Sequence, residues 1–443
     1  MLATLVFGMS LRDSALVILF FALVTCIPPA FMATGGANTG LRQQVQARYS
    51  FGLYLVTIPL LLNAATVTGF SLISAIVGGQ AIASLNSSHV SVNVGIVIVS
   101  LVSFAASFMG YKALHFWERW TWIPSLISLV IAVGCGGKHL HLQSVVPPST
   151  PSQVLSYGGL IAGYFLTFGG TVSDYSVYHD PRHASKYVSL LIPPSLSQPS
   201  NLPPHLTPNH VRLKIFTYTY LGFFLPSVPL LILGAAIGGA VPQVPAWEAA
   251  YAVSGVGGVF REMLRPAGGF GCFVVVLLAL SVVGNVAISM YSVALNLQML
   301  FPPLARVPRF VFTVAVFAVM IPLAVAAAAR WEESVENFLA LIGYYAGCFD
   351  AVLLVELIVF RRLRFETYDH AVWNVGRKLP SGLAAVGASV ASFGLVVPGM
   401  AENWYTGPIA EKTGDIGFEF AFVVTALLYV PLRWLEIRIR GHL

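Results

Sequence analysis

The sequence contains little charge for its length. Only 9% of its 443 residues are Asp, Glu, Lys or Arg, whereas 57% are hydrophobic and the mean hydropathy is +0.79. A soluble domain carries about 25% charged residues. This composition excludes a soluble globular protein and predicts an all-α polytopic membrane protein that forms one transmembrane domain over residues 1–443. The net charge of +6 is then a signal of membrane topology, and no nucleic-acid partner is expected.

Cysteines and catalytic motifs are also scarce. The four cysteines lie in or at the ends of apolar stretches without CxxC spacing, which excludes a disulfide framework and a zinc site. The HExxH, GxSxG, Ser/Lys and paired-aspartate signatures of intramembrane enzymes do not occur in these stretches. We therefore expect that the protein is not an enzyme and that it holds neither a metal nor a cofactor. The residues that follow Met1 do not have the pattern of a cleavable signal peptide.

Apolar stretches of roughly 18 residues or more, the length that a bilayer requires, fill most of the chain. Eleven such stretches follow one another, so we expect eleven membrane spans. The second is longer than a bilayer needs and is expected to tilt or bend. The spans lie near residues 14–35, 52–83, 90–111, 119–137, 156–179, 213–240, 269–300, 309–329, 336–360, 382–400 and 416–433.

The basic residues are distributed unevenly between the loops. Most of the 24 Lys and Arg residues follow spans one, three, five, seven and nine or lie in the C-terminal tail. The positive-inside rule places these segments, including a basic loop at 361–381 and the C-terminus, in the cytosol. Eleven spans then leave the N-terminus outside, and one further span before Met1 would bring it inside. Asn86 begins an Asn-Ser-Ser sequon in an outside loop, which predicts glycosylation.

The stretch from Ser156 to Asp180 reads as a membrane span that is not one straight helix. Its apolar first half is followed by the adjacent glycines Gly169 and Gly170, where the backbone can unwind, and then by the acid Asp174. Broken helices of this kind hold the central site of many secondary transporters. The alternative is an ordinary span that ends at Gly169, with Asp174 as a helix cap or a loop residue.

The stretch 188–210 is rich in proline and serine. It holds six prolines and five serines or threonines, so we expect it to form neither a helix nor a packed core. A disordered cytosolic loop and a translated intron both remain open as explanations.

Several stretches together resemble the fungal purine–cytosine permeases of the nucleobase–cation symporter family. They occur in the order of the family and span nearly the whole chain. This resemblance implies twelve helices in a LeuT-like fold with inverted repeats, and proton-coupled uptake across the plasma membrane. The stretches are LRDSALVILFFALVTCIPPAF, GLRQQVQARYSFG, AIVGGQAIASLN, GYKALHFWERWTWIP, VSDYSVY, WEAAYAVSGVGGVF, GGFGCFVVVLLALS, RVPRFVFT, ENFLALIGYYAG and GDIGFEFAF.

The resemblance also implies that the first predicted span is family helix two. The first part of helix one is then expected to be missing, which leaves eleven spans of an expected twelve. The stretch 188–210 falls where the family has only a short basic loop. Both features suggest a faulty gene model or a decayed gene.

Four positions that the resemblance assigns to the substrate site depart from the family in one direction. Phe70 and Phe168 stand where the family has Trp, and Ser74 and Ser289 stand where it has Asn, while Asn285 is kept. A Phe stacks over less area than Trp, and a Ser hydroxyl cannot make the two-point contact of an amide. We therefore expect either that the site is adapted to another small heterocycle or that natural selection no longer maintains it. Taken singly, each Phe is better explained by lipid contact or core packing and each Ser by packing between helices, and only the set of four favours a substrate site.

Other polar residues in the spans are candidates for the transport pathway. Gln80 either lines that pathway or packs at the neighbouring glycines. Glu118 and Asp174 are the expected proton-coupling acids, with Glu118 favoured because the family has a functional Glu in its ERW motif. A surface ion pair is the alternative for Glu118. Glu356 matches a family acid, whereas Asp350 matches no family position that we recognise.

The function that these features favour is secondary active transport. We expect a proton-coupled symporter that imports cytosine, adenine, guanine, hypoxanthine or a related small heterocycle, with the substrate, the proton and the bilayer as its partners. Two alternatives remain: a non-transporting relic of the same family, and a carrier for a heterocyclic metabolite that is not a nucleobase.

Overall fold

The structure is a computed structural model that describes residues 1–86, 89–178, 207–298, 300, 304 and 306–441. Within those ranges the side chains of residues 111, 112, 114, 115, 118 and 207–211 are not described. Most of the proline- and serine-rich stretch at 188–210 therefore lies outside the described residues.

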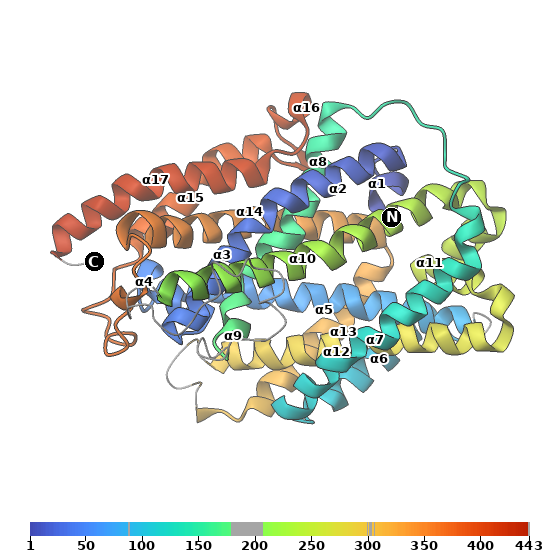
Figure 1. Ribbon diagram of the computed structural model, residues 1–443, viewed down its shortest axis with the longest axis horizontal. Coiled ribbons are helices and arrows are strands. Elements are labelled where there is room, and N and C mark those ends of the chain that lie inside the picture. Colours follow the sequence, from blue (N-terminus) through green and yellow to red (C-terminus); the bar gives the residue numbers. More distant parts are fainter. Residues whose placement is uncertain (87–88, 179–206, 299, 301–303, 305, 442–443) are drawn as a thin grey trace. The chain divides into compact units, whose positions relative to one another are not determined.

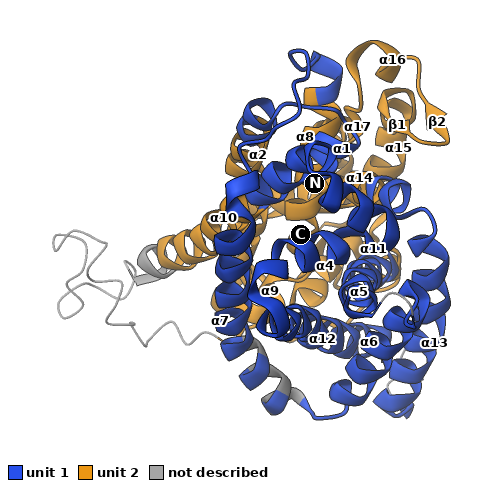
Figure 2. Cartoon of the chain, turned by 90° about the vertical axis from the view of Figure 1, so that its right-hand side faces the viewer, with its two compact units in different colours: residues 1–16, 60–153, 231–338 blue, residues 17–59, 154–230, 339–443 orange. Residues whose placement is uncertain are grey.

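The chain divides into two compact units, each assembled from three separate segments (Figure 2). Unit 1 comprises residues 1–16, 60–153 and 231–338. Unit 2 comprises residues 17–59, 154–230 and 339–443. Because neither unit is continuous in sequence, each forms only when helices from distant parts of the chain pack together.

The regular secondary structure of the described residues of unit 1 is helical. Helix α12 packs against α6, α7 and α13, and α6 also packs against α13. Buried apolar residues such as Ala75, Met290 and Phe317 fill the centre of this packing. The elements are α1 (Leu2–Leu5), α5 (Thr57–Leu85), α6 (Val92–Ser107), α7 (Tyr111–Gly136), η1 (Gly137–His139), η4 (Val241–Gln243), α11 (Pro245–Met263), η5 (Arg265–Ala267), α12 (Gly268–Gln298) and α13 (Arg309–Ala328) (Figure 1).

Unit 2 holds the remaining elements, and α2, α5, α8, α10 and α14 have residues in both units. The elements are α2 (Leu11–Thr25), α3 (Ile27–Thr39), α4 (Gln43–Phe51), α8 (Pro151–Leu166), η2 (Thr167–Gly170), α9 (Val172–Ser176), α10 (Thr207–Ala240), α14 (Trp331–Val355), the π-helix η7 (Glu356–Phe360), η8 (Phe365–Thr367), α15 (Leu383–Gly399), α16 (Ala410–Thr413), α17 (Gly417–Arg440) and an antiparallel pair of short strands, β1 (Ala401–Glu402) and β2 (Tyr405–Thr406).

Each of the eleven predicted spans coincides with helical residues. By length and composition, eight helices of the described chain can cross a membrane, and α6 and α15 are shorter apolar helices. The number of spans therefore stays a prediction. The second span begins at Thr57 rather than near residue 52, because Gly52 has φ of +71° and ends the preceding helix α4.

Three helical features differ from the sequence analysis. The short helix α4 is polar and α11 is amphipathic, so neither has the hydropathy of a span. The backbone of residues 207–210 belongs to α10, although the whole stretch at 188–210 was expected to be non-helical. Pro208 lies in the first turn of that helix, where proline is tolerated because its missing N–H has no helical partner.

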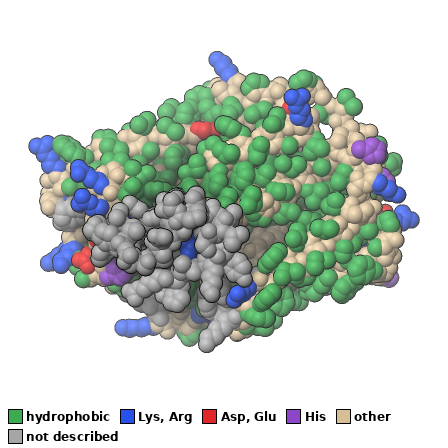
Figure 3. Space-filling view, in the orientation of Figure 1, with side chains coloured by type: hydrophobic (Ala, Val, Ile, Leu, Met, Phe, Trp, Pro, Cys, Tyr) green, Lys and Arg blue, Asp and Glu red, His purple; other side chains and the backbone are tan. Residues whose placement is uncertain are grey.

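The outer surface is apolar. Figure 3 shows hydrophobic side chains over much of the described surface of one face, and Lys and Arg side chains are sparse there. Helix α13, for example, exposes Phe310, Val314 and Leu323. Exposed apolar area on this scale requires a non-aqueous cover, which is consistent with a surface that faces lipid.

A buried ion-pair network joins the π-helix η7 to α17 in unit 2. The carboxylate of Glu356 is 3.0 Å from both Arg361 and Arg433, and it accepts the Tyr429 hydroxyl at 2.9 Å. Arg433 also pairs with Glu436 at 3.0 Å. All of these side chains are almost fully buried. The structure thus gives Glu356 two counter-charges inside the protein.

We predict that Glu356→Ala strongly destabilises the protein. The change leaves Arg361 and Arg433 buried without the carboxylate that they contact. Removing one partner of a buried ion pair lowers the free energy of unfolding by about 3–5 kcal/mol. Thermal unfolding of the purified protein in detergent measures the effect. Glu366→Ala, which removes an exposed acid of the following loop, is the control. Equal midpoints for the two variants would contradict the prediction.

Candidate functional site

Two predicted site residues in unit 1 meet directly. Asn285 of α12 donates a hydrogen bond from Nδ2 to the Ser74 hydroxyl of α5 at 3.0 Å. An amide has two N–H donors and one carbonyl acceptor, so Asn285 keeps a donor and an acceptor beyond this bond. The pair therefore presents a polar edge that could recognise the edge of a heterocycle.

A cavity of about 330 Å³ adjoins Asn285. Its walls come from α7 and α12, both in unit 1, and they combine indole rings with hydroxyl groups. A planar, polar ligand needs this combination of aromatic surface and a few hydrogen-bonding groups. The lining residues are Trp117, Thr121, Trp122 and Ser125 of α7 and Ser281, Val282, Gly284 and Asn285 of α12.

Glycine at position 284 brings the α7 wall close to α12. A Cβ atom there would collide with the indole of Trp117, so the ring lies against the bare Cα of Gly284. Trp117, Thr121 and Ser125 follow one another at intervals of four, which places them on one face of α7. Sequence reasoning missed these residues, although the aromatic run HFWERWTWIP and this spacing carried the signal.

The other predicted substrate residues have neighbours within their own units. Phe70 lies edge-on to Phe338 with ring centroids 5.3 Å apart, and Ser289 follows Asn285 by one helical turn in unit 1. In unit 2, Phe168 packs against Phe223 with ring centroids 4.8 Å apart. The structure therefore brings Ser74 and Asn285 together and places Phe168 in the other unit.

Gln80 occupies a break in α11. Ser254 and Gly255 leave helical geometry there, with φ of +56° at Gly255. The Gln80 side chain is 4% exposed, and its Oε1 accepts the Val256 N–H at 3.1 Å. A Cβ at Gly255 would collide with this amide, so the glycine is needed both for its backbone angle and for space. The geometry gives Gln80 a capping role at this break.

The span predicted to be broken is interrupted in unit 2. Helix α8 ends at Leu166, a 3-10 turn follows over Thr167–Gly170, and Thr171 has non-helical angles (φ −137°, ψ −15°). The five-residue helix α9 then begins at Val172. The interruption leaves backbone N–H and C=O groups that need partners outside the helix.

Helix α4 supplies those partners. Gln43 accepts the Ser173 N–H at 3.3 Å, and the Gln44 side chain donates to the Gly170 carbonyl at 2.9 Å. In return, Asp174 accepts the Gln43 N–H at 2.8 Å. Side chains of α4 and α9 thus cap each other's first turns, and an acid is favourable at a helix N-terminus. Gln43 and Gln44 were not among the predicted site residues.

Glycines hold α8 against α14. The Cα atoms of Gly163 and Gly343 lie so close that a Cβ at either position would contact the opposite backbone. Further along both helices, a Cβ at Gly169 would collide with the Asp350 carboxyl group. The second contact lies further toward the C-terminus than the first on both segments, so the two helices run parallel. Close glycine packing of this kind is typical of membrane helices and brings Asp350 to the interruption.

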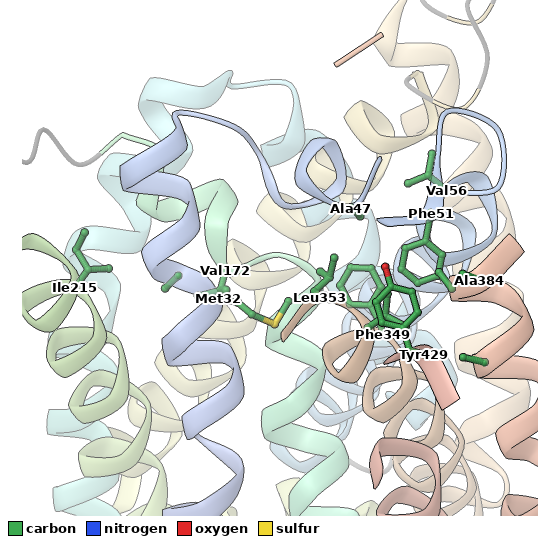
Figure 4. Packing of buried hydrophobic residues seen from close by; sticks show 14 residues of the cluster. Met32, Ala47, Phe51, Val56, Val172, Ile215, Phe349, Leu353, Ala384 and Tyr429 are labelled. Atoms are coloured by element: carbon green, nitrogen blue, oxygen red, sulfur yellow. The ribbon is translucent and has the colours of Figure 1, made fainter. Parts of the chain in front are cut away.

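An apolar cluster surrounds the same region of unit 2. Figure 4 shows Met32, Val172 and Leu353 near one another, and Phe51 stacks on Phe349 with ring centroids 5.9 Å apart. These residues come from α3, α9, α14 and α4. The cluster fixes the helices on both sides of the interruption and excludes water from it.

Two predicted residues are placed only in part. The backbone of Glu118 belongs to α7, but its side chain lies outside the described residues. Asn86 is exposed in the short loop between α5 and α6, and residues 87–88 of its sequon are outside the description. In the part of the chain that the structure describes, no group of three or more His, Cys, Asp or Glu residues could hold a metal ion.

A helical membrane protein with one interrupted span and a polar cavity among its helices has the architecture of a secondary transporter. Comparison with solved structures supports this fold. The chain is similar to Mhp1, a nucleobase-cation-symport-1 family transporter solved in a closed conformation with bromovinylhydantoin bound. The TM-score is 0.69 at 15% identity, and the match covers 97% of this chain and 87% of Mhp1. The predicted LeuT-like inverted-repeat fold is confirmed.

The chain belongs to the family of permeases for cytosine/purines, uracil, thiamine and allantoin, whose model matches residues 1–199 and 205–416. It is 33% identical to the purine-cytosine permease fcyB of Emericella nidulans, over 99% of this chain and 81% of fcyB. It is 32% identical to the purine-cytosine permease FCY2 of Saccharomyces cerevisiae, over 100% of this chain and 80% of FCY2. The family predicted from the sequence is confirmed, and the protein is a multi-pass membrane permease.

The capping role of Gln80 yields a prediction. Gln80→Ala leaves the Val256 N–H without its acceptor, which costs about 1–3 kcal/mol for a buried group. We expect faster amide hydrogen exchange across the break in α11, with Ser84→Ala of the same helix as the control. If Gln80 acts only in the transport pathway, substrate affinity will change while exchange at Val256 stays as in the wild type.

Proposed function

We propose that the protein is a proton-coupled symporter that imports a nucleobase, such as cytosine, adenine, guanine or hypoxanthine, across the plasma membrane. The cavity beside Asn285 carries this proposal. It combines indole rings, hydroxyl groups and an amide within one unit, and those groups match the stacking faces and the polar edge of a nucleobase.

The residues proposed for the substrate site in unit 1 are Phe70, Ser74, Asn285 and Ser289, and Phe168 of unit 2 stays a proposed substrate residue on the family resemblance alone. The hydrogen bond between Asn285 and Ser74 supports this assignment, because it fixes the amide and so limits which base edge can pair with it. Ser74 accepts one of the two N–H donors of the Asn285 amide, so that donor is not available to a ligand. This arrangement favours a ligand that offers its own donor to the remaining carbonyl, and it would distinguish the site from one lined by two amides.

The cavity walls extend the proposed site beyond the sequence prediction. Trp117 and Trp122 each offer an aromatic face, and stacking on a base contributes about 1–3 kcal/mol. The small Val282 and Gly284 on the opposite wall leave room for a flat ring. Gln80 fits this site less well, because its amide oxygen is taken by Val256.

Proton coupling requires an acid whose protonation changes during the transport cycle. Glu118 and Asp174 remain the proposed coupling acids. Asp174 lies at the interrupted span, where it accepts the Gln43 backbone N–H and interacts electrostatically with Arg42.

We predict that Asn285→Ala and Trp117→Ala each weaken nucleobase binding by about ten- to a hundredfold. The first removes two hydrogen bonds and the second one stacking face, each worth roughly 1–3 kcal/mol. Equilibrium binding of labelled cytosine, adenine, guanine and hypoxanthine to the purified protein measures the effect. Trp404→Ala, at an exposed loop tryptophan, is the matched control.

Two results would argue against this proposal. Nucleobase binding that is unchanged in both cavity variants would place the substrate elsewhere. Failure of the folded wild-type protein to bind any of the four bases would favour a non-transporting relic or a carrier for another heterocycle.

The proposed orientation has its own test. If the loop between α5 and α6 faces outward, Asn86 receives an N-linked glycan during expression in a eukaryotic cell. We expect Asn86→Gln to remove a mobility shift that glycosidase treatment also removes. A C-terminal tag that becomes accessible only after permeabilisation would support a cytosolic C-terminus. A tag accessible on intact cells would overturn the orientation.

A further inference from the structure

Asp350 is a buried acid without a counter-charge. Its side chain is 0% exposed, and neither carboxyl oxygen has a hydrogen-bond partner among the described residues. Its neighbours on α14, from Phe349 to Leu353, are buried and hydrophobic. An ionised carboxylate in such surroundings costs several kcal/mol, so the group needs either a proton or a bound cation.

Glu356, on the π-helix that follows α14, is a buried acid of the same region that has counter-charges. It has Arg361 and Arg433 at 3.0 Å and the Tyr429 hydroxyl at 2.9 Å. These partners give Glu356 two counter-charges and assign it a structural role. Asp350, two turns earlier, has no such partners in the described chain, which leaves its protonation state free to change.

Other titratable groups near Asp350 are engaged elsewhere. Tyr345, one turn earlier on α14, interacts electrostatically with Asp350 but donates its hydroxyl to a backbone carbonyl at 2.8 Å. Three charged groups of the helices around it have partners of their own: Asp174 of α9 with Gln43, Arg48 of α4 with Asn374, and Arg433 of α17 with Glu356. Glu419, in the first turn of α17, has one oxygen without a partner among the described residues.

The Asp350 carboxyl group touches the interruption itself. It lies against the Cα of Gly169, the residue before the Gly170 carbonyl that Gln44 holds. The Gln44 side chain is 2% exposed, and its Oε1 likewise lacks a partner among the described residues. These unpaired oxygens of Asp350 and Gln44 are acceptors, and a proton is the smallest species that converts one of them into a donor.

We propose that Asp350 is a proton-binding site of the transport cycle. The proposal rests on the proposed proton-coupled function and adds a site that the sequence analysis did not include. Tight packing against Gly169 favours a proton over a sodium ion, because a metal ion needs several more oxygen ligands and room for them. Since the carboxyl group contacts the interrupted helix, gain or loss of the proton changes the interactions of the segment that rearranges in broken-helix transporters.

Proteoliposomes with the wild-type protein and with Asp350→Asn test the proposal. Asn has nearly the shape of a protonated Asp but cannot release a proton. We expect the variant to keep counterflow exchange of labelled nucleobase between the two sides. It should lose accumulation driven by an imposed inward proton gradient. Glu366→Gln, at an exposed acid, should keep both activities.

The outcomes separate this proposal from the proposed function. Accumulation by Asp350→Asn equal to the wild type would overturn the proton site. Accumulation by the wild type that follows a sodium gradient rather than a proton gradient would also overturn it. Absence of wild-type counterflow would refute nucleobase transport instead.

A spectroscopic measurement remains decisive in that last case and if Asp350→Asn folds poorly. Infrared spectra of the wild type across a pH titration report the C=O stretch of a protonated carboxyl group. We expect a band that shifts in Asp350→Glu, because the longer side chain changes its surroundings. A wild-type spectrum in which no buried carboxyl group is protonated at any pH that preserves the fold would overturn the proposal.

Discussion

The structure depends on how the chain satisfies the backbone where α8 is interrupted. An unpaired backbone group away from water costs about as much as a lost hydrogen bond, and this region is closed by apolar side chains. The glutamines of α4 remove most of that cost, since Gln43 and Gln44 bind a backbone N–H and a carbonyl on either side of Thr171. The interruption is therefore fixed by a neighbouring helix and does not depend on chain flexibility.

The same interruption connects packing to function. Glycines let α8 and α14 approach closely, and this approach delivers the Asp350 carboxyl group to Gly169. Asp174 is fixed on the other side of Thr171 by the backbone of α4. Two acids with different surroundings thus flank one interrupted segment, whereas Glu356 is neutralised by arginines. In the proposed function, differences of this kind distinguish Glu356, which stabilises the fold, from the acids that are proposed to exchange a proton.

The sequence predicted much of the fold because membrane spans are long and apolar. Every predicted span coincides with helical residues, and the glycine pair at 169–170 lies in the turn that ends α8. The sequence could not predict α4, because a polar nine-residue helix has no hydropathy signal, and its burial depends on partners from α9 and α15. The sequence could not predict the break in α11 either. Gln80, which stabilises that break, comes from a distant part of the chain.

The candidate site was predictable only where the family resemblance assigned its positions. That resemblance singled out Ser74 and Asn285, and each stands four residues from a second assigned position, Phe70 or Ser289, on one helix face. The sequence alone did not identify Trp117 as a site residue, because aromatic residues are common in membrane helices. Its contact with Gly284 depends on how α7 packs on α12. Asp350 was visible as an acid in a span, but only the packing of α14 against α8 shows what it touches.

A structure determined with a nucleobase bound would test the central claim most directly. The result that we predict is a base in the unit 1 cavity, with its polar edge within hydrogen-bonding distance of the Asn285 amide and its ring against Trp117 or Trp122. A base bound elsewhere in the protein, with this cavity empty, would contradict the assignment of the substrate site.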